Sequence, residues 1–260
     1  MGKVVPPPIL YKYCTFDGAH ATFQNSAFRF TPLVEFNDPY EFMPAQTDLS
    51  ADTDIILEHM LRTKGSEYSE QEKAKILSCL SSDEARQHLL KQLKDGNYNI
   101  LSAAKAFVSS YLACCFSEHN NSLLMWAHYA QQHQGICIAV ETAQSMIYQQ
   151  VIYQKERPRL SFSEDPKTFQ RLLYTKSIDW AYEKEWRILL QKEDTVARFE
   201  EGKYLVPIKK SGIKAIYFGL RTPVAQKEKL KKLLPPSVKF YHAQEHPVEY
   251  ELVFAEDTSF

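Results

Sequence analysis

Short apolar runs recur along most of this chain, several with alternating polar positions. Residues 9–15 form an aromatic-rich run, and residues 27–31 alternate apolar and polar side chains until Pro32. Residues 111–116 and 135–141 are mainly apolar. Runs of this length and pattern are typical of β-strands. Further strands are predicted at residues 149–154, 185–191, 204–208, 215–219, 238–242 and 249–254.

A helical pattern replaces the strands in three places. Residues 52–112 hold two capping boxes, Ser69 with Glu72 and Ser81 with Glu84, which mark helix starts. Shorter helices are predicted at residues 122–132 and 224–234. Several strands close together, without regularly alternating helices, favour an α+β fold with a bent sheet that is mixed or mainly antiparallel. We therefore predict a single domain over residues 1–260 with a helical insertion at about residues 52–112.

Composition narrows the class of protein. At 260 residues the chain is long enough to bury a substantial core. Its hydrophobic content of 44% and aromatic content of 13% are those of a globular protein rather than a disordered one. A formal net charge of -1 argues against a broad basic surface for nucleic acid.

The cysteines and the N-terminal residues indicate the cellular compartment in which the protein is expected. The five cysteines form no CxxC pair, and several lie in apolar runs, which indicates a reducing compartment. The first residues lack the apolar core of a signal peptide, and no later apolar run is long enough to cross a membrane. We therefore expect a cytoplasmic protein with no membrane association.

Three segments are unusually rich in polar and aromatic side chains together: residues 36–41, 124–129 and 180–187. Such side chains are costly to bury without partners, so they indicate either a satisfied polar core or a ligand site. In the first segment, Asn37 and Asp38 precede Pro39. This order is typical of a turn that pins a loop, and it also suits a loop beside a pocket.

The third segment carries two acids two positions apart. If it is extended, Glu183 and Glu185 share one face while Lys184 and Trp186 point to the other. One interpretation is catalytic. The other is structural, with Arg187 and a carboxylate holding a strand in register beside packed indoles.

The helix expected at residues 122–132 carries an aromatic stripe. Trp126, Tyr129 and His133 fall on one side, which usually indicates core packing but also suits ring contacts with a ligand. His128 lies on a neighbouring stripe, where it could carry protons near neutral pH. The histidines show no tight metal-ligand spacing, so no metal site is predicted.

These segments, with Cys115-Phe116-Ser117, Gly135 and residues 216–219, resemble the bacterial domain-of-unknown-function family 2971. That likeness implies a bacterial protein but carries no established activity. The order of the parts is also similar, more loosely, to the ADP-ribosyltransferase superfamily. This second resemblance implies a toxin-like enzyme of bacterial or phage-defence context that consumes NAD, either an ADP-ribosyltransferase or an NAD glycohydrolase. Its substrate is then a small-molecule nucleotide, and its acceptor a protein or nucleic acid.

The second resemblance also implies roles for individual residues. Glu185 would steady the oxocarbenium-like transition state, with Glu183 as a base and His128 or Arg187 as polar auxiliaries. Tyr11, Lys12 and Tyr13 would lie against the nicotinamide ribose, where the superfamily usually has His or Arg rather than Lys12. Ring contacts would come from Tyr11, Tyr13, Trp126 and Tyr129.

Two other functions stay open. The chain lacks GxGxxG, GxxxxGK[ST] and GxSxG motifs, which argues against a dinucleotide fold, a P-loop and a hydrolase elbow. A Mg²⁺-dependent nuclease would use Asp38, Glu141, Glu183 and Glu185 as ligands, with Lys12 or Lys184 on the phosphate. A non-enzymatic module would use the aromatic pocket to sense a ligand or bind a partner.

Overall fold

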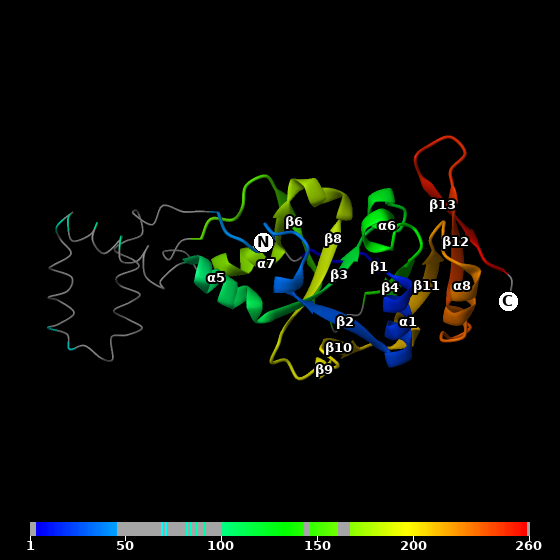
Figure 1. Ribbon diagram of the computed structural model, residues 1–260, viewed down its shortest axis with the longest axis horizontal. Coiled ribbons are helices and arrows are strands. Elements are labelled where there is room, and N and C mark those ends of the chain that lie inside the picture. The colour runs from blue at the N-terminus through cyan, green and yellow to red at the C-terminus, as the bar shows by residue number, and fades with distance from the viewer. Residues whose placement is uncertain are drawn as a thin grey trace. The chain divides into compact units, whose positions relative to one another are not determined.

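The computed structural model describes residues 4–45, 100–142, 146–160 and 167–258, with six isolated positions between residues 69 and 91 (Figure 1). The described residues fall into two compact units. The first lies within the ranges 1–36, 110–153 and 176–260, and the second within 37–109 and 154–175. Most of the predicted insertion, including Glu72 and Ser81 of its capping boxes, lies outside the described residues.

The first unit is built around one large sheet. Its strand order is β13-β12-β11-β4-β1-β3-β2-β10-β9, and β8 pairs with both β3 and β5. The strands are β1 (Ile9–Cys14), β2 (Ala27–Pro32), β3 (Tyr111–Ser117), β4 (Ile136–Glu141), β5 (Gln149–Gln150), β8 (Glu185–Gln191), β9 (Arg198–Glu200), β10 (Lys203–Pro207), β11 (Ile213–Phe218), β12 (Lys239–Glu245) and β13 (Leu252–Glu256). A two-stranded ribbon pairs β6 (Ile152–Gln154) with β7 (Thr175–Ser177).

The predicted fold class is confirmed. The described strand pairs of the large sheet are antiparallel except β11 with β12, which run parallel. Helix α8 (Val224–Lys231) makes the crossover between those two strands. Most predicted strands are found with small shifts at their ends; β8 matches its predicted range, whereas β13 begins at Leu252 rather than at residue 249. The single strand predicted at residues 149–154 is wrong, because β5 joins the large sheet and β6 joins the ribbon.

Helix α1 (Phe16–Asn25) was not predicted from the sequence pattern. Its start is fixed by Thr15, whose side chain accepts a hydrogen bond from the Gly18 N–H at 3.1 Å. Phe16, Ala19 and Phe23 then fall on one buried face of the helix. Burial of that face stabilises the helical conformation of a segment whose helix propensity is only moderate.

Helix α6 (Leu123–Tyr129) ends earlier than predicted. Its start is capped by the Ser122 hydroxyl, which accepts the Met125 N–H at 3.3 Å. The helix cannot reach residue 132, because Gln131, Gln132 and His133 have φ of 49°, 54° and 67°, in the left-handed region. The predicted helical stripe through His133 is therefore wrong.

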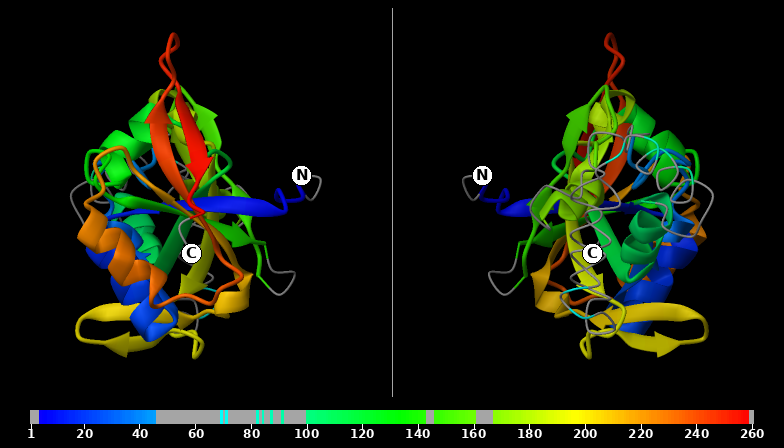
Figure 2. Two further views of the ribbon diagram at one scale, coloured as in Figure 1. Left: turned by 90° about the vertical axis from the view of Figure 1, so that its right-hand side faces the viewer. Right: turned by 90° about the vertical axis from the view of Figure 1, so that its left-hand side faces the viewer.

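The two faces of the sheet differ in chemistry. One face forms the main apolar core, which includes Phe16 and Phe23 of α1 and Leu230 of α8. These two helices lie side by side on it (Figure 2). Trp186 and Ile188 of β8 point into this core. Because side chains alternate along a strand, Glu185 and Arg187 point to the opposite face.

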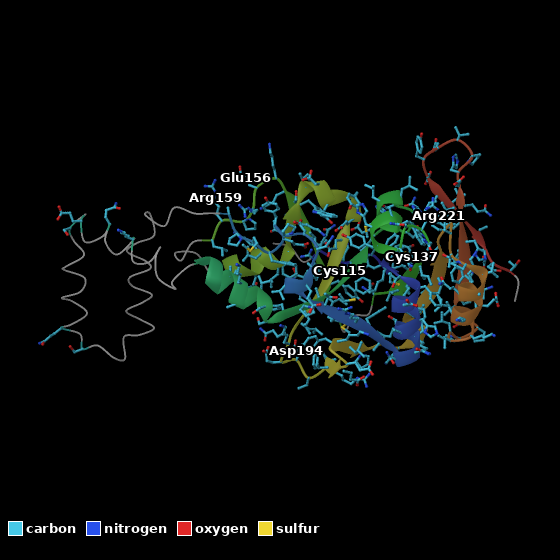
Figure 3. All side chains as sticks on the ribbon, in the orientation of Figure 1. Cys115, Cys137, Glu156, Arg159, Asp194 and Arg221 are labelled. Atoms are coloured by element: carbon cyan, nitrogen blue, oxygen red, sulfur yellow. The ribbon has the colours of Figure 1, made fainter. Side chains whose placement is uncertain are left out.

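The opposite face packs against α6. Tyr13, Met125, Trp126, Ala130, Cys137 and Leu252 form a second buried apolar cluster. Tyr11, Tyr129, Tyr182 and Tyr217 pack partly buried against it. Cys115 of β3 and Cys137 of β4 lie on two strands that are separated by β1 (Figure 3). Four tyrosine side chains therefore lie around α6 on this face of the sheet.

The second unit contains helices α5 (Ile100–Ser109) and α7 (Lys167–Tyr174), which pack together. Phe107 and Phe169 meet edge to face between them, with ring centres 5.6 Å apart. Helix α7 was not predicted. None of the described helices is both long enough and apolar enough to cross a lipid bilayer.

Candidate functional site

Four charged side chains are buried together at the start of β8, and we call them the charged quartet: Lys176, Glu183, Glu185 and Arg187. Their exposed fractions are 5%, 2%, 4% and 0% respectively. The quartet holds two carboxylates and two cations, so its formal charges balance. Buried charges are tolerated only when they are paired and hydrogen-bonded in this way.

Arg187 and Glu185 form a two-pronged ion pair within β8. The Arg187 Nε donates to Glu185 Oε1 at 2.7 Å, and Nη2 donates to Oε2 at 2.9 Å. Burial alone would raise the pKa of Glu185, but Arg187 and Lys176 outweigh it and hold that pKa well below its usual range. Glu185 is therefore a permanent anion at neutral pH.

Glu183 reaches the same lysine from a different element. It is the last residue of the 3-10 helix η4 (Ile178–Glu183), and Lys184 follows with φ of 45°. The predicted extended segment from Glu183 to Glu185 is therefore wrong. The left-handed turn at Lys184 nevertheless brings both carboxylates to Lys176, whose Nζ lies 2.7 Å from Glu183 Oε2 and 3.4 Å from Glu185 Oε2.

The second oxygen of Glu183 faces α6. The Tyr129 hydroxyl donates to Glu183 Oε1 at 2.6 Å. Burial and the nearby Glu185 anion raise the pKa of Glu183, against the opposing effects of Lys176 and Tyr129. Two carboxylates that share one lysine therefore differ in proton affinity, a difference that is typical of acid and base pairs in enzymes.

Neighbouring strands fix the backbone under the quartet. The Ser117 hydroxyl of β3 donates to the Glu183 carbonyl oxygen at 2.7 Å, and the Glu185 N–H donates to the Tyr153 hydroxyl at 2.8 Å. Cys115 of β3 lies beside Glu185, and burial raises the pKa of its thiol. The thiol is thus protonated and unsuited to act as a nucleophile.

Three aromatic side chains surround the Tyr129 side of the quartet, and we call them the aromatic rim: His128, Trp180 and Tyr182. Their ring centres lie 6.1–6.3 Å from one another. The Tyr182 hydroxyl and His128 Nδ1 are 2.9 Å apart. His128 is exposed, whereas Trp180 and Tyr182 are partly exposed. Lys176 Nζ lies 4.9 Å from the centre of the Trp180 ring.

The predicted ring contacts Tyr13 and Trp126 lie deeper. Trp126 is fully buried and meets Tyr13 edge to face, with ring centres 5.4 Å apart. The Trp126 Nε1 donates to the Asn120 carbonyl oxygen at 2.6 Å. Both rings belong to the same cluster as Tyr11 and Tyr129. Trp126 of α6 thus packs the helix against Tyr13 of β1, which leaves ligand contact to the more exposed rim.

Two groups of predicted residues have contacts of their own. Lys12 points to the apolar side of the sheet, where its Nζ lies 5.5 Å from the Phe116 ring centre and 3.3 Å from the Cys115 carbonyl oxygen. Asn37 and Asp38 belong to the second unit. There, Asp38 Oδ1 accepts the Tyr40 N–H at 2.8 Å, which confirms the predicted turn.

Sequence reasoning missed four residues of this site. Lys176 and Tyr153 lie outside the three polar-aromatic segments, so no local signal marked them. Trp180 and Tyr182 lie within the third segment but were not proposed as ligand contacts. Residues two apart share a face in an extended strand but not in a 3-10 helix, so the spacing of Trp180 and Tyr182 within η4 did not indicate that their rings meet.

No cluster of candidate metal ligands stands out. Among the residues that the structure describes, no three His, Cys, Asp or Glu side chains gather as a metal site. Glu141, a proposed ligand of the nuclease alternative, is more than half exposed and pairs with Lys214 at 2.8 Å. Among the described residues, Glu141 is therefore not gathered with Glu183 and Glu185.

Comparison with known proteins yields one match. The family model described as a protein of unknown function (DUF2971) matches residues 125–188. This segment holds all of the charged quartet and the aromatic rim. Neither the curated proteins nor the solved structures gave a match. The chain is therefore similar to this uncharacterised family over the segment that builds the candidate site.

Proposed function

We propose that this protein is an NAD-consuming enzyme, an ADP-ribosyltransferase or an NAD glycohydrolase, and that Glu183 is its key carboxylate. The observation that carries the proposal is the unequal pair of buried glutamates beneath partly exposed aromatic side chains. The looser resemblance to the ADP-ribosyltransferase superfamily supports the same substrate. That resemblance implies Glu185 as the key carboxylate, whereas the hydrogen bonds of the two glutamates favour Glu183.

The division of roles follows from the hydrogen bonds. Both oxygens of Glu185 are held by Arg187, so this carboxylate cannot turn toward a substrate without breaking a buried pair. Glu183 is bonded to one hydroxyl and one ammonium, and the hydroxyl belongs to a partly exposed tyrosine. Glu185 and Arg187 are therefore positioning residues, and Glu183 is the candidate catalytic residue.

The chemistry needs an anion beside the ribose. When the bond between ribose and nicotinamide breaks, its electron pair leaves with nicotinamide and the ribose becomes oxocarbenium-like. The Glu183 anion would steady that charge and then accept the proton of the attacking water or acceptor hydroxyl. The products of hydrolysis are ADP-ribose, nicotinamide and one proton.

The aromatic rim would hold the rings of the substrate. Trp180 and Tyr182 offer apolar ring faces that stack well on a nicotinamide or adenine ring. His128 is held by its contact with the Tyr182 hydroxyl and could pass a proton to solvent. Tyr129 joins the rim to the Glu183 carboxylate, because its ring lies beside His128 and its hydroxyl donates to Glu183 Oε1.

Nicotinamide release from NAD tests the proposal. Purified wild-type protein is incubated with NAD, and nicotinamide is measured by chromatography. We expect Glu183→Gln to reduce release by a factor of about 100 or more, within the range that acid-base groups contribute. Glu200→Gln is the matched control, because Glu200 is an exposed glutamate on β9 that pairs only with an exposed arginine in the described contacts. No release by the wild type, or equal release by Glu183→Gln, contradicts the proposal.

A ligand-binding module is the second candidate. The observation in its favour is that the four charges of the quartet satisfy one another, as in a structural core. Such a protein would bind NAD without turnover. A rise in the thermal midpoint with NAD, together with an absence of nicotinamide release, would support this candidate instead.

A further inference from the structure

A second group of titratable side chains lies on the other side of the sheet, under α8. It comprises Lys227 and Lys231 of α8, His242 of β12 and Asp257, which follows β13. Figure 1 shows α8 beside β12 and β13. The charged quartet lies on the opposite face of the sheet, so this group plays no part in the function proposed above.

The side chains form a connected line. His242 Nε2 lies 2.6 Å from Asp257 Oδ2, and His242 Nδ1 lies 3.1 Å from Lys227 Nζ. A proton on Nε2 satisfies the carboxylate and leaves the Nδ1 lone pair facing the lysine. Asp257 therefore orients the imidazole as a base toward Lys227.

We propose that Lys227 is a nucleophilic amine that forms an imine with an aldehyde or ketone ligand. An amine, a base within hydrogen-bond reach and a carboxylate that orients the base make up the arrangement that activates nucleophiles in enzymes. The site is independent of NAD chemistry.

The surroundings of Lys227 favour its neutral form. Its Nζ lies 5.7 Å from the centre of the Phe218 ring, which covers one side of the amine. Lys231, one helical turn away, pairs with Asp257 at 2.7 Å and with Glu228 at 3.4 Å. Burial and the Lys231 cation lower the pKa of Lys227, against the opposing effect of Asp257.

The site is accessible to a small reagent. Lys227 is partly exposed, and 29% of the His242 side chain is exposed. The reaction is balanced without an outside oxidant or reductant. Lys227 gives one proton to His242 Nδ1, its neutral amine attacks the carbonyl carbon, and the resulting carbinolamine loses water to give the imine.

Reductive trapping tests this proposal. The full-length protein is treated at pH 7 with limiting glyoxylate and cyanoborohydride, which delivers hydride to the imine and fixes a carboxymethyl group on the lysine. Peptide mass spectrometry then gives the labelling rate of each lysine. Lys229 is the internal reference, because it lies on the same helix and is exposed.

We expect Lys227 to be labelled several-fold faster than Lys229, because only the neutral amine attacks the carbonyl carbon. His242→Gln keeps an N–H for Asp257 but removes the base, so it should slow the labelling of Lys227 while the labelling rate of Lys229 stays the same. Equal or slower labelling of Lys227 in the wild type would overturn the proposal. That ratio needs no variant, so the result stands even if His242→Gln is unstable.

Discussion

Replacing Arg187 with methionine tests whether the quartet is a balanced buried charge cluster. The substitution keeps an unbranched side chain of similar length but removes the guanidinium. It leaves Glu185, which is 4% exposed, without its two-pronged partner. An uncompensated buried carboxylate is strongly destabilising, because it has lost both water and its counter-charge.

The structure sets the expected size of the effect. Removal of one partner from a buried pair typically costs about 3–5 kcal/mol. Lys176 stays 3.4 Å from Glu185 Oε2 and compensates in part, so we expect about 3 kcal/mol. For a chain of this length, that corresponds to a fall in Tm of roughly 6–12 °C.

Arg198→Met is a matched control. Arg198 pairs with Glu200 at 3.2 Å, also two residues apart on a strand, but about half of each side chain is exposed. We expect a loss below about 1 kcal/mol, because exposed ion pairs contribute little. Both variants are unfolded with urea and by heat, followed by circular dichroism.

A double-mutant cycle completes this test. Adding Glu185→Gln to Arg187→Met removes the orphaned anion, so the double variant should recover part of the loss, with a coupling of about 1–3 kcal/mol. If Arg187→Met is no less stable than Arg198→Met, or if the double variant shows purely additive losses, then the pair does not hold the site together as described.

Two further predictions concern packing and pH. Gly219→Ala should lower the free energy of unfolding by about 1–3 kcal/mol, because a Cβ there would overlap the His133 carbonyl oxygen. Gly212→Ala is the control, because its Cβ meets open space, and it should change the free energy of unfolding by less than about 0.5 kcal/mol. Urea unfolding measures both. The glutamates should respond oppositely to pH in thermal melts. The folded-state pKa of Glu185 is lowered, so its contribution is complete above the ordinary value of 4.5 and is lost on acidification below it; Glu185→Gln should flatten that loss. The folded-state pKa of Glu183 is raised to about 6, so its contribution is complete below 4.5 and is lost as the pH rises toward 6; Glu183→Gln should abolish that decline.

The strands could be read from the sequence because each carries its own signal. A strand is recognised from a local pattern, namely alternating or continuous apolar residues between turn residues. The predicted bounds of β1, β4 and β8 are therefore close to the observed ones. Helix α1 was missed because Gly18, His20 and Thr22 weaken its helical pattern. Its stability comes from burial against the sheet, which a local pattern does not show.

The site was only partly predictable, because long-range contacts do not show in a local sequence pattern. The carboxylates and Arg187 lie in a conspicuous segment, but Lys176, which joins them, reaches the quartet through the long-range placement of β7. Strand alternation alone would have separated Lys12 from Tyr11 and Tyr13. The turn at Lys184 requires a left-handed backbone conformation, which a lysine side chain does not favour and therefore does not predict.

Tryptophan fluorescence during a titration with NAD tests the central claim most directly. The chain has three tryptophans, and Trp126 and Trp186 are 0% and 1% exposed, so a ligand that stacks on the rim must act on Trp180. We predict saturable quenching in the wild type that is lost in Trp180→Phe and kept in Glu200→Gln. No quenching in the wild type, or equal quenching in Trp180→Phe, would contradict a nucleotide site at the aromatic rim.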